Sequence, residues 1–266
     1  MSYPPSSFNP FGYTRPRGYA AEPWMNQASQ VTDAIACEDN GWLGLITGGA
    51  SVTTITEQKG GVGAGLTGLS WTTGFASRDI GYVQFGTPGS GGNGSATFDA
   101  VAARFTGTAI PWTIFMTVWL KANTPGGGPV HYLLSFGNSA SAQSFIGFTI
   151  LTGGTQLVFQ RRNNAGTLLT TPTAVTLGTA GPCVIVANYD GANISTRVNR
   201  TPVDTAFAFG GGALTTNRFT LGGLRLNGAA SGFSNMSLDR CILAPASLNA
   251  QNQTLIEDFL CRRIGI

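Results

Sequence analysis

Alternating apolar and polar positions recur along the second half of the chain and predict β-strands. The segment 183–189 (CVIVANY) has the two-residue period of a strand whose two faces are both largely buried. Asp190-Gly191 readily supplies the positive φ that a chain reversal needs, and the alternation resumes over 194–198. We therefore predict a hairpin over 183–203, with one wetter strand, inside an antiparallel sheet.

The most apolar strand pattern is 113–121 (TIFMTVWLK). Both of its alternating sets of side chains are largely apolar, which predicts a central strand that is covered on both sides. Further strands are predicted near 131–136, 145–151 and 155–162. A last strand pattern covers 233–243.

In that last strand, simple alternation places four side chains on one face, namely Met236, Leu238, Arg240 and Ile242. Because an arginine lies among three apolar residues, we do not expect this face to be fully excluded from solvent. The period changes only after this strand. Apolar residues from Leu248 to Ile264 then follow a helical stripe, with Asn249 as N-cap and Gly265 just beyond the end.

These patterns together predict an all-β protein, with a two-sheet antiparallel sandwich and one short C-terminal helix. We expect the helix to lie against the sandwich and to close one edge. A chain of 266 residues is long enough to fold as one sandwich with its own core.

Residues 1–30 differ from the rest of the chain. Five prolines exclude a continuous helix there. A solvated linker would not carry as many aromatic residues as lie between them. The aromatic and basic residues of this segment are Tyr3, Phe8, Phe11, Tyr13, Arg15, Arg17, Tyr19 and Trp24.

Two interpretations of this segment stay open. Residues 1–30 either fold back on their own sandwich or form an extended anchoring arm whose aromatic side chains fill pockets on a neighbouring subunit. We expect the anchoring arm, so that the predicted domains are the arm at 1–30 and the sandwich at 31–266.

The composition excludes some partners. Charged residues make up 10% of the chain, against roughly 25% in an average soluble domain, and Gly accounts for 38 residues. Such a surface suits packing against protein or hydrogen bonding to hydroxyl-rich ligands. The net charge of +3 is spread without a Lys/Arg cluster, so that no nucleic-acid partner is expected.

The four cysteines, Cys37, Cys183, Cys241 and Cys261, are far apart and form no CxxC pair. Cys183 and Cys241 fall on strand patterns and Cys261 on a helix pattern, and we expect these three to be buried free thiols, because a core of this size needs no disulfide. The N-terminus has no apolar signal-peptide region, and no segment approaches the roughly 18 apolar residues of a membrane span. We expect a protein that is made in a cytoplasm and not exported by an ordinary signal peptide.

No catalytic group is predicted. Glycoside hydrolysis needs an acid and a nucleophile spaced roughly 5 Å apart, and the nearest carboxylates here, Glu38-Asp39 and Glu257-Asp258, are adjacent pairs. His131 is the only histidine, which excludes a multi-histidine zinc site. We predict no cofactor and no metal.

Some aromatic residues lie near predicted loops, where they can stack on a sugar. Trp71, Trp112 and Tyr132 are the candidates for a ligand-facing role. Packing in the core is the commoner fate of such residues.

The second half of the chain resembles the laminin-G-like, concanavalin-A-like jelly-roll superfamily. The segments that carry the resemblance are 113–122 (TIFMTVWLKA), 188–199 (NYDGANISTRVN), 218–224 (RFTLGGL), and 233–243 followed by 248–260. The resemblance covers about residues 70–266. It implies a jelly roll of two stacked antiparallel sheets with about 12–14 strands.

The family usually has glycine after the Val-Asn of 198–199, where this chain has Arg200, so that an altered turn is expected. The resemblance also implies that calcium is a candidate ligand of the loop rim, because laminin-G-like domains often bind it there. By position the candidates are Asp99 and Asp190. Too few acids cluster to supply the usual six or more oxygen ligands, and we therefore do not expect the ion.

The superfamily contains lectins, adhesion modules, glycosidases and virion surface proteins, so that the fold alone decides no function. Our main hypothesis is a non-enzymatic structural or adhesion protein of a virus particle, as a bacteriophage head decoration or tail component. It would be located in the virion as a homo-oligomer, bound to other virion structural proteins through its arm, with host-surface glycans as a further ligand. The alternative is a free-standing glycan-binding, lectin-like module.

Overall fold

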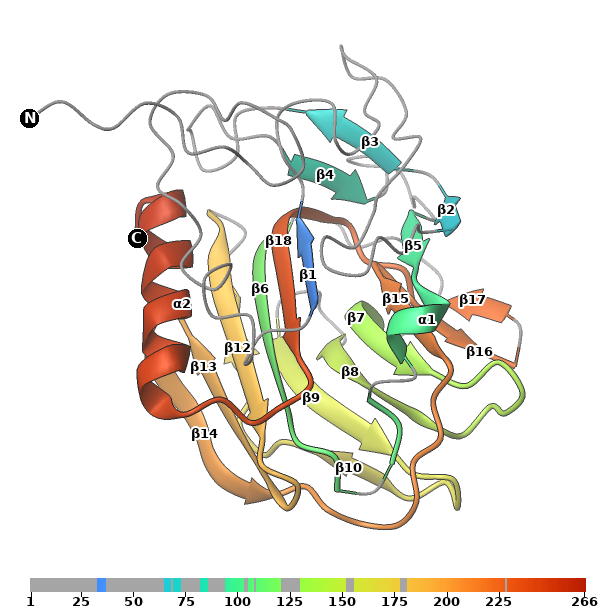
Figure 1. Ribbon diagram of the computed structural model, residues 1–266. Coiled ribbons are helices and arrows are strands. Elements are labelled where there is room, and N and C mark those ends of the chain that lie inside the picture. The colour runs from blue at the N-terminus through green and yellow to red at the C-terminus, as the bar shows by residue number, and fades with distance from the viewer. Residues whose placement is uncertain are drawn as a thin grey trace, which may run out of the picture.

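The computed structural model contains two antiparallel β-sheets that pack face to face, with one long helix on the outside of the first sheet (Figure 1). The structure describes residues 33–36, 65–67, 69–72, 82–85, 94–102, 105–107, 109–120, 130–151, 156–177, 181–227 and 229–266. Within these ranges, no helix is long and apolar enough to cross a membrane.

The first sheet has the strand order β14-β13-β12-β6-β18-β4-β3, with β1 pairing to β18. Its strands are β1 (Asp33–Ala36), β3 (Leu69–Thr72), β4 (Tyr82–Phe85), β6 (Trp112–Leu120), β12 (Cys183–Tyr189), β13 (Asn193–Val198), β14 (Thr201–Ala208) and β18 (Met236–Ala244). The predicted hairpin over 183–203 is confirmed as β12, β13 and the start of β14. The predicted central strand is confirmed as β6, which lies between β12 and β18.

The second sheet has the order β10-β9-β8-β7-β15-β5-β2, with β11 pairing to β9. Its strands are β2 (Gly65–Thr67), β5 (Ser95–Thr97), β7 (His131–Gly137), β8 (Phe145–Ile150), β9 (Gln156–Arg162), β10 (Leu168–Thr170), β11 (Val175–Thr176) and β15 (Arg218–Leu221). A separate hairpin pairs β16 (Leu224–Leu226) with β17 (Ala229–Ser231), and a short helix, α1 (Asp99–Ala102), follows β5. The two-sheet antiparallel fold class is thereby confirmed.

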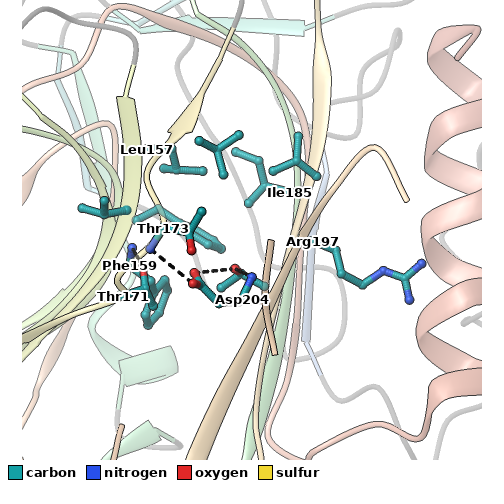
Figure 2. A pocket seen from close by; sticks show the side chains of 12 residues that line it. Leu157, Phe159, Thr171, Thr173, Ile185, Arg197 and Asp204 are labelled. Carbon is teal, nitrogen blue, oxygen red and sulfur yellow. Dashed lines mark hydrogen bonds between the residues drawn. The ribbon is translucent and has the colours of Figure 1, made fainter. Parts of the chain in front are cut away.

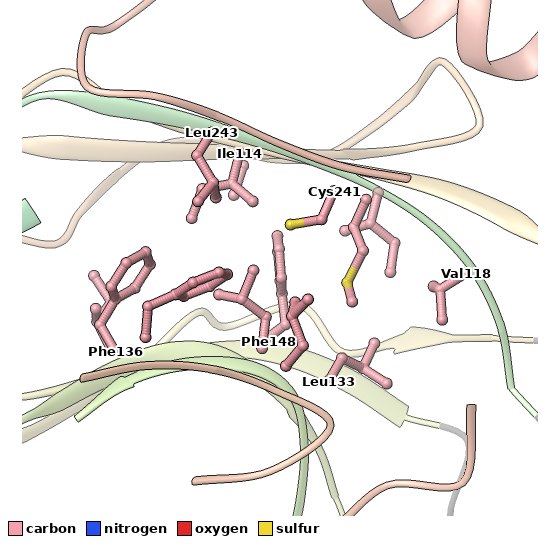
Figure 3. Packing of buried hydrophobic residues seen from close by; sticks show 14 of the residues in the cluster. Ile114, Val118, Leu133, Phe136, Phe148, Cys241 and Leu243 are labelled. Atoms are coloured by element: carbon pink, nitrogen blue, oxygen red, sulfur yellow. The ribbon is translucent and has the colours of Figure 1, made fainter. Parts of the chain in front are cut away.

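The core fills the space between the two sheets (Figure 3). Side chains such as Ile114 from β6 and Leu243 from β18 meet Phe136 and Phe148 from β7 and β8, and all four are at most 1% exposed. Phe136 also stacks on Phe219, with ring centroids 4.8 Å apart. Each such buried side chain contributes roughly 1.5–3 kcal/mol, so that the sandwich is held together chiefly by this layer.

Helix α2 (Ala250–Ile264) begins and ends where the sequence predicts. The side chain of Asn249 accepts a hydrogen bond from the backbone N–H of Asn252 at 2.9 Å, which caps the first turn. Gly265 has φ +84°, the left-handed conformation of a helix C-terminal cap, and its N–H donates to the carbonyl of Arg262. Both predicted end residues are confirmed.

The position of α2 differs from the expectation that it closes an edge. Its apolar side packs on the outer face of three adjacent strands, against Phe115 of β6, Val184 and Val186 of β12 and Ile242 of β18. The helix lies there because the outward residues of these central strands are apolar, and an apolar sheet face is stabilised when it is covered.

Strand β18 contains a β-bulge, which corrects the predicted grouping of its side chains. The pairing with β6 skips one residue between Leu238 and Arg240, so that Asp239 is an extra residue in the strand. Met236 and Leu238 therefore face the core between the sheets, whereas Ile242 faces α2. Alternation alone cannot detect an inserted residue.

Cys183, Cys241 and Cys261 are buried free thiols, as the sequence predicts. Cys37 and the segment 1–30 lie outside the described residues, and so does the predicted boundary between the arm and the sandwich.

Candidate functional site

The predicted arm residues, from Tyr3 to Trp24, lie outside the described part of the chain. Trp71 lies in β3, where its backbone pairs with Val83 of β4, but its side chain is outside the description. The arm and Trp71 therefore stay predictions.

Trp112 and Tyr132 are packed inside the protein and offer no open ring to a ligand. The indole of Trp112 is 4% exposed and lies 5.3 Å from the ring of Phe159 and 5.5 Å from that of Tyr189, between centroids. Tyr132 is 9% exposed and meets Phe145 edge-on at 5.7 Å. Burial raises the pKa of Tyr132. Both side chains are therefore packed in hydrophobic clusters, as is common for aromatic residues.

The two calcium candidates are occupied by other contacts. Oδ1 of Asp190 accepts the backbone N–H of Asn193 at 2.7 Å and that of Ala192 at 2.8 Å, and these hydrogen bonds lower the pKa of the carboxyl. Asp99 lies 3.4 Å from Nη1 of Arg218. Within the described residues, no three acidic, histidine or cysteine side chains gather as a metal site would require.

The acidic pair that the sequence drew attention to, Glu257-Asp258, fastens α2 to the β13–β14 hairpin. Oε1 of Glu257 accepts the backbone N–H of Arg200 at 2.7 Å. Nη2 of Arg197 lies 2.9 Å from Oε2, near enough for an ion pair although without hydrogen-bond geometry. Asp258 accepts from Nε of Arg200 at 2.6 Å.

A second acidic contact fastens the C-terminal end of the helix. Asp239, the bulged residue of β18, is fully buried and is bound by both Nε and Nη2 of Arg263 at 2.9 and 3.0 Å. This two-point contact is the geometry in which arginine binds carboxylates most strongly. The bulge thus turns a carboxylate toward α2, which explains why an aspartate is tolerated in a buried strand.

One small cavity lies between the sheets near β14, β9 and β11 (Figure 2). Its volume of about 10 Å³ is enough for about one water molecule and not for a sugar ring. The carboxylate of Asp204 at its wall accepts from Oγ1 of Thr196 at 3.1 Å and from the backbone N–H of Thr173 at 3.3 Å. Arg197 turns away from the cavity toward α2. Asp204 therefore joins the edges of the two sheets.

A surface at one end of the second sheet has a different character. Three loops meet there, namely 138–144 between β7 and β8, 163–167 between β9 and β10, and 210–217 before β15. The strand register places their ends side by side, since Gly137 pairs with both Phe145 and Arg218. We call these three loops the polar rim.

Side-chain amides and hydroxyls connect the loops of the polar rim. Oδ1 of Asn217 accepts the backbone N–H of Ser139 at 2.8 Å, and its Nδ2 donates to Oγ of the same serine at 2.8 Å. Oδ1 of Asn164 accepts from Oγ of Ser144 at 2.6 Å and from the N–H of Thr215 at 2.9 Å. Nδ2 of Asn164 donates to Oγ1 of Thr215 at 2.9 Å. Each loop is thereby fixed to another one.

A buried arginine supports the rim from below. Arg161 is 2% exposed, and its Nη1 and Nη2 donate to the carbonyls of Gly211 and Gly212 at 2.5 and 2.6 Å. Asn163 donates to the carbonyl of Gly211 as well, at 3.1 Å. Burial lowers the pKa of Arg161. These bonds fix a glycine-rich segment that would otherwise be free to adopt many conformations.

Sequence reasoning did not identify the polar rim. The only signal was the general richness in Asn, Ser, Thr and Gly, which is spread over the whole chain. The partners that build the rim lie 51 and 78 positions apart, so that no local pattern reports them.

No family model matches this chain, and no curated protein sequence matches it. Solved structures that resemble it include a mutant of Trypanosoma rangeli sialidase with trans-sialidase activity, at 16% identity and a TM-score of 0.59, covering 92% of this chain and 34% of that one. The same sialidase in complex with sialic acid matches at 16% identity and a TM-score of 0.58, over 98% of this chain and 36% of that one. A complex with the inhibitor DANA matches at 16% identity and 0.57, over 89% and 34%.

At this identity the likeness shows the fold alone. This fold is a β-sandwich of two antiparallel sheets, which is the coarser part of the resemblance found in the sequence. This chain spans about a third of the length of those sialidases.

The comparisons correct the main functional hypothesis. The similar structures are sialidases, which act on glycans, and they do not support a non-enzymatic structural protein of a virus particle. That hypothesis was wrong because it combined the anchoring arm, the low charge, the absent signal peptide and the sandwich fold, and none of these features reports what the sandwich binds. The alternative, a glycan-binding module, fits these findings better.

Proposed function

We propose that this chain is a lectin-like module that binds glycans and does not cleave them. The observation that carries the proposal is the sandwich itself, which matches part of a sialidase solved in complex with sialic acid, over 98% of this chain. Because the match covers 36% of that protein, its enzymatic activity is the property of a chain nearly three times as long. We therefore extend glycan binding, but not catalysis, from that sialidase to this chain. The laminin-G-like character suggested by the sequence belongs to this proposal as well.

The contacts of the acidic residues argue against hydrolysis. Cleavage of a glycosidic bond commonly needs two carboxyl groups that face one sugar. Every carboxylate from residue 94 onward already holds a turn, a helix or a sheet edge. These are Asp99, Asp190, Asp204, Asp239, Glu257 and Asp258.

Some glycosidases, sialidases among them, use tyrosine as the nucleophile instead. Two tyrosine side chains are described, Tyr132 and Tyr189, and both are buried. Burial raises the pKa of each hydroxyl, which disfavours the nucleophilic phenolate. The hydroxyl of Tyr189 also donates to the carbonyl of Gly191 at 2.6 Å.

The test uses the full chain in two assays. A glycan array, printed at high density, measures binding, and release of a fluorophore from an α-sialoside and from neutral glycosides measures cleavage. We expect glycan binding without turnover. Turnover that purifies with the protein would contradict the non-catalytic proposal, and the absence of binding to any glycan would contradict the lectin-like one.

A further inference from the structure

None of the residues of the polar rim (138–144, 163–167 and 210–217) is charged. Its three sequences are NSASAQS, NNAGT and GGGALTTN. Below the rim, the guanidinium of Arg161 donates hydrogen bonds to two backbone carbonyls, those of Gly211 and Gly212. Arg218, which follows the last loop, is paired with Asp99. A ligand on the rim therefore contacts side-chain amides, hydroxyls and backbone groups, and no charged side chain of the three loops.

We propose that the polar rim is the glycan-binding surface and that it selects uncharged glycans. The inference rests on the proposed function, and names its site and ligand class. A neutral sugar presents hydroxyl groups, each of which donates and accepts hydrogen bonds. A carboxylate-bearing sugar would lose hydration on the three loops without gaining a cation from them in return. Arg162, which precedes the second loop, lies with its guanidinium 5.6 Å from the centroid of the Phe145 ring.

The hydrogen bonds within the rim leave a defined set of donors free. An asparagine amide has two N–H groups, and one from each of Asn164 and Asn217 is used inside the rim. The second N–H of each amide is left for a ligand. The hydroxyl oxygens of Thr215 and Ser139 act as acceptors inside the rim, so that their O–H groups are left to donate. Asn164, Thr215 and Asn217 are exposed.

The same bonds fix the orientation of these donors. In both amides the oxygen and the nitrogen have separate partners on another loop, so that the side chain cannot rotate without breaking a bond. A site whose groups are already ordered loses less entropy when a ligand binds. The cross-linking of the loops therefore favours binding and not only stability.

The apolar part of the rim is small. Exposed methyl groups come from Ala140, Ala142, Ala165 and Ala213, and no aromatic ring is exposed among these loops. Contacts with the C–H faces of a sugar are correspondingly modest. We expect single-site affinity on the order of millimolar, so that binding is strong only to clustered glycans, where avidity raises it.

The first experiment compares pairs of glycans on one array, each with and without a terminal sialic acid. The full chain should bind neutral members and lose binding, by about tenfold or more, when the acid is added. Binding to the sialylated members alone would overturn the inference and leave the proposed function intact. Absence of binding to every glycan would instead contradict the proposed function.

The second experiment tests the location. The double substitution Asn164→Asp and Asn217→Asp keeps the size of both side chains and replaces their donors with acceptors. We expect binding to neutral glycans to fall by about tenfold or more. Gln251→Glu on α2 is the control, since it makes one amide-to-carboxylate change at an exposed site away from the rim.

An unchanged circular dichroism spectrum and melting temperature would show that the double variant folds. If the fold is lost, Thr215→Ser and Ser139→Ala, made separately, give the readout. The first retains a hydroxyl and should retain binding, while the second removes a donor and should weaken binding. Neutral-glycan binding that is unaffected in the folded variants would overturn the assignment to the rim.

Discussion

The backbone N–H of Arg200 donates a hydrogen bond to Oε1 of Glu257 at 2.7 Å. Asn199 and Arg200, the two central residues of the β13–β14 turn, have φ of +50° and +69°, a conformation that glycine adopts most easily. The helix therefore stabilises a turn in which neither residue is glycine. The turn at Arg200, where the sequence departs from the glycine usual in the resembling family, is thus one of the places where α2 is attached to the sheet.

The first prediction concerns that attachment. Glu257→Ala removes the acceptor of the turn and leaves the N–H of Arg200 and the guanidinium of Arg197 without it. We expect the free energy of unfolding to fall by about 2–3 kcal/mol. Urea denaturation measures the change. Asp258→Ala, which removes a half-exposed partner of the same turn, is the control and should cost much less. Equal losses in the two variants would contradict this account.

The second prediction concerns pH. Burial raises the pKa of Glu257 above its ordinary value of 4.5, despite the opposing effect of the hydrogen bond from Arg200. Between 4.5 and the higher folded-state value, the folded protein holds more protons on this group than the unfolded chain does. The contribution of Glu257 to stability is therefore full below pH 4.5 and declines as the pH rises.

Glu257→Gln has no such titration, and the other groups of the protein titrate in both proteins. The stability of the native protein relative to this variant should therefore decline as the pH rises from about 4.5. Thermal unfolding over a series of buffers measures the difference. A difference that is flat, or that grows with pH, would show that the pKa of Glu257 is not raised.

The third prediction concerns the bulge in β18. Arg263→Met removes the two-point partner of the fully buried carboxylate of Asp239 and leaves Nη1 of Arg240, 3.6 Å from Oδ1, as the neighbouring cation. We expect a cost of about 3 kcal/mol. The double variant with Asp239→Asn should recover part of this loss, because a neutral amide is less costly to bury than a carboxylate, while it also removes the anion beside Arg240. A double-mutant cycle in urea measures the coupling. Additive effects of the two substitutions would contradict the pairing.

The fourth prediction concerns the thiols. Burial raises the pKa of Cys183 to about 12 and that of Cys261 to about 11, so that little thiolate is present at neutral pH. In a Cys37→Ser background, a thiol reagent should label Cys183, Cys241 and Cys261 only after denaturation. Mass spectrometry counts the labels. Rapid labelling of the native protein would contradict their burial.

Local patterns were sufficient to predict much of the fold. The strands around 113–121 and 183–203 and both ends of α2 follow from periodicity and capping residues, which are properties of neighbours in the sequence. The bulge at Asp239 was missed because one inserted residue changes the faces of a strand without changing its composition. The position of α2 was missed because it depends on which strands with apolar outer faces lie next to one another in the sheet.

The site was harder to predict than the fold. Trp112 and Tyr132 lie at the beginning of β6 and β7, and the direction of a side chain there is set by the register and by the opposing sheet, which the sequence does not display. The polar rim depends on contacts such as that of Asn164 with Thr215, which the topology alone brings together.

The most direct test of a glycan-binding rim is an NMR titration of the full chain with a neutral oligosaccharide. The side-chain amide signals of Asn164 and Asn217 report on the two donors that the rim leaves free. We predict that these signals and the backbone signals of 138–144, 163–167 and 210–217 shift in a saturable way, and that those of α2 do not. Shifts confined to other residues, or none at concentrations above about 10 mM, would contradict the account.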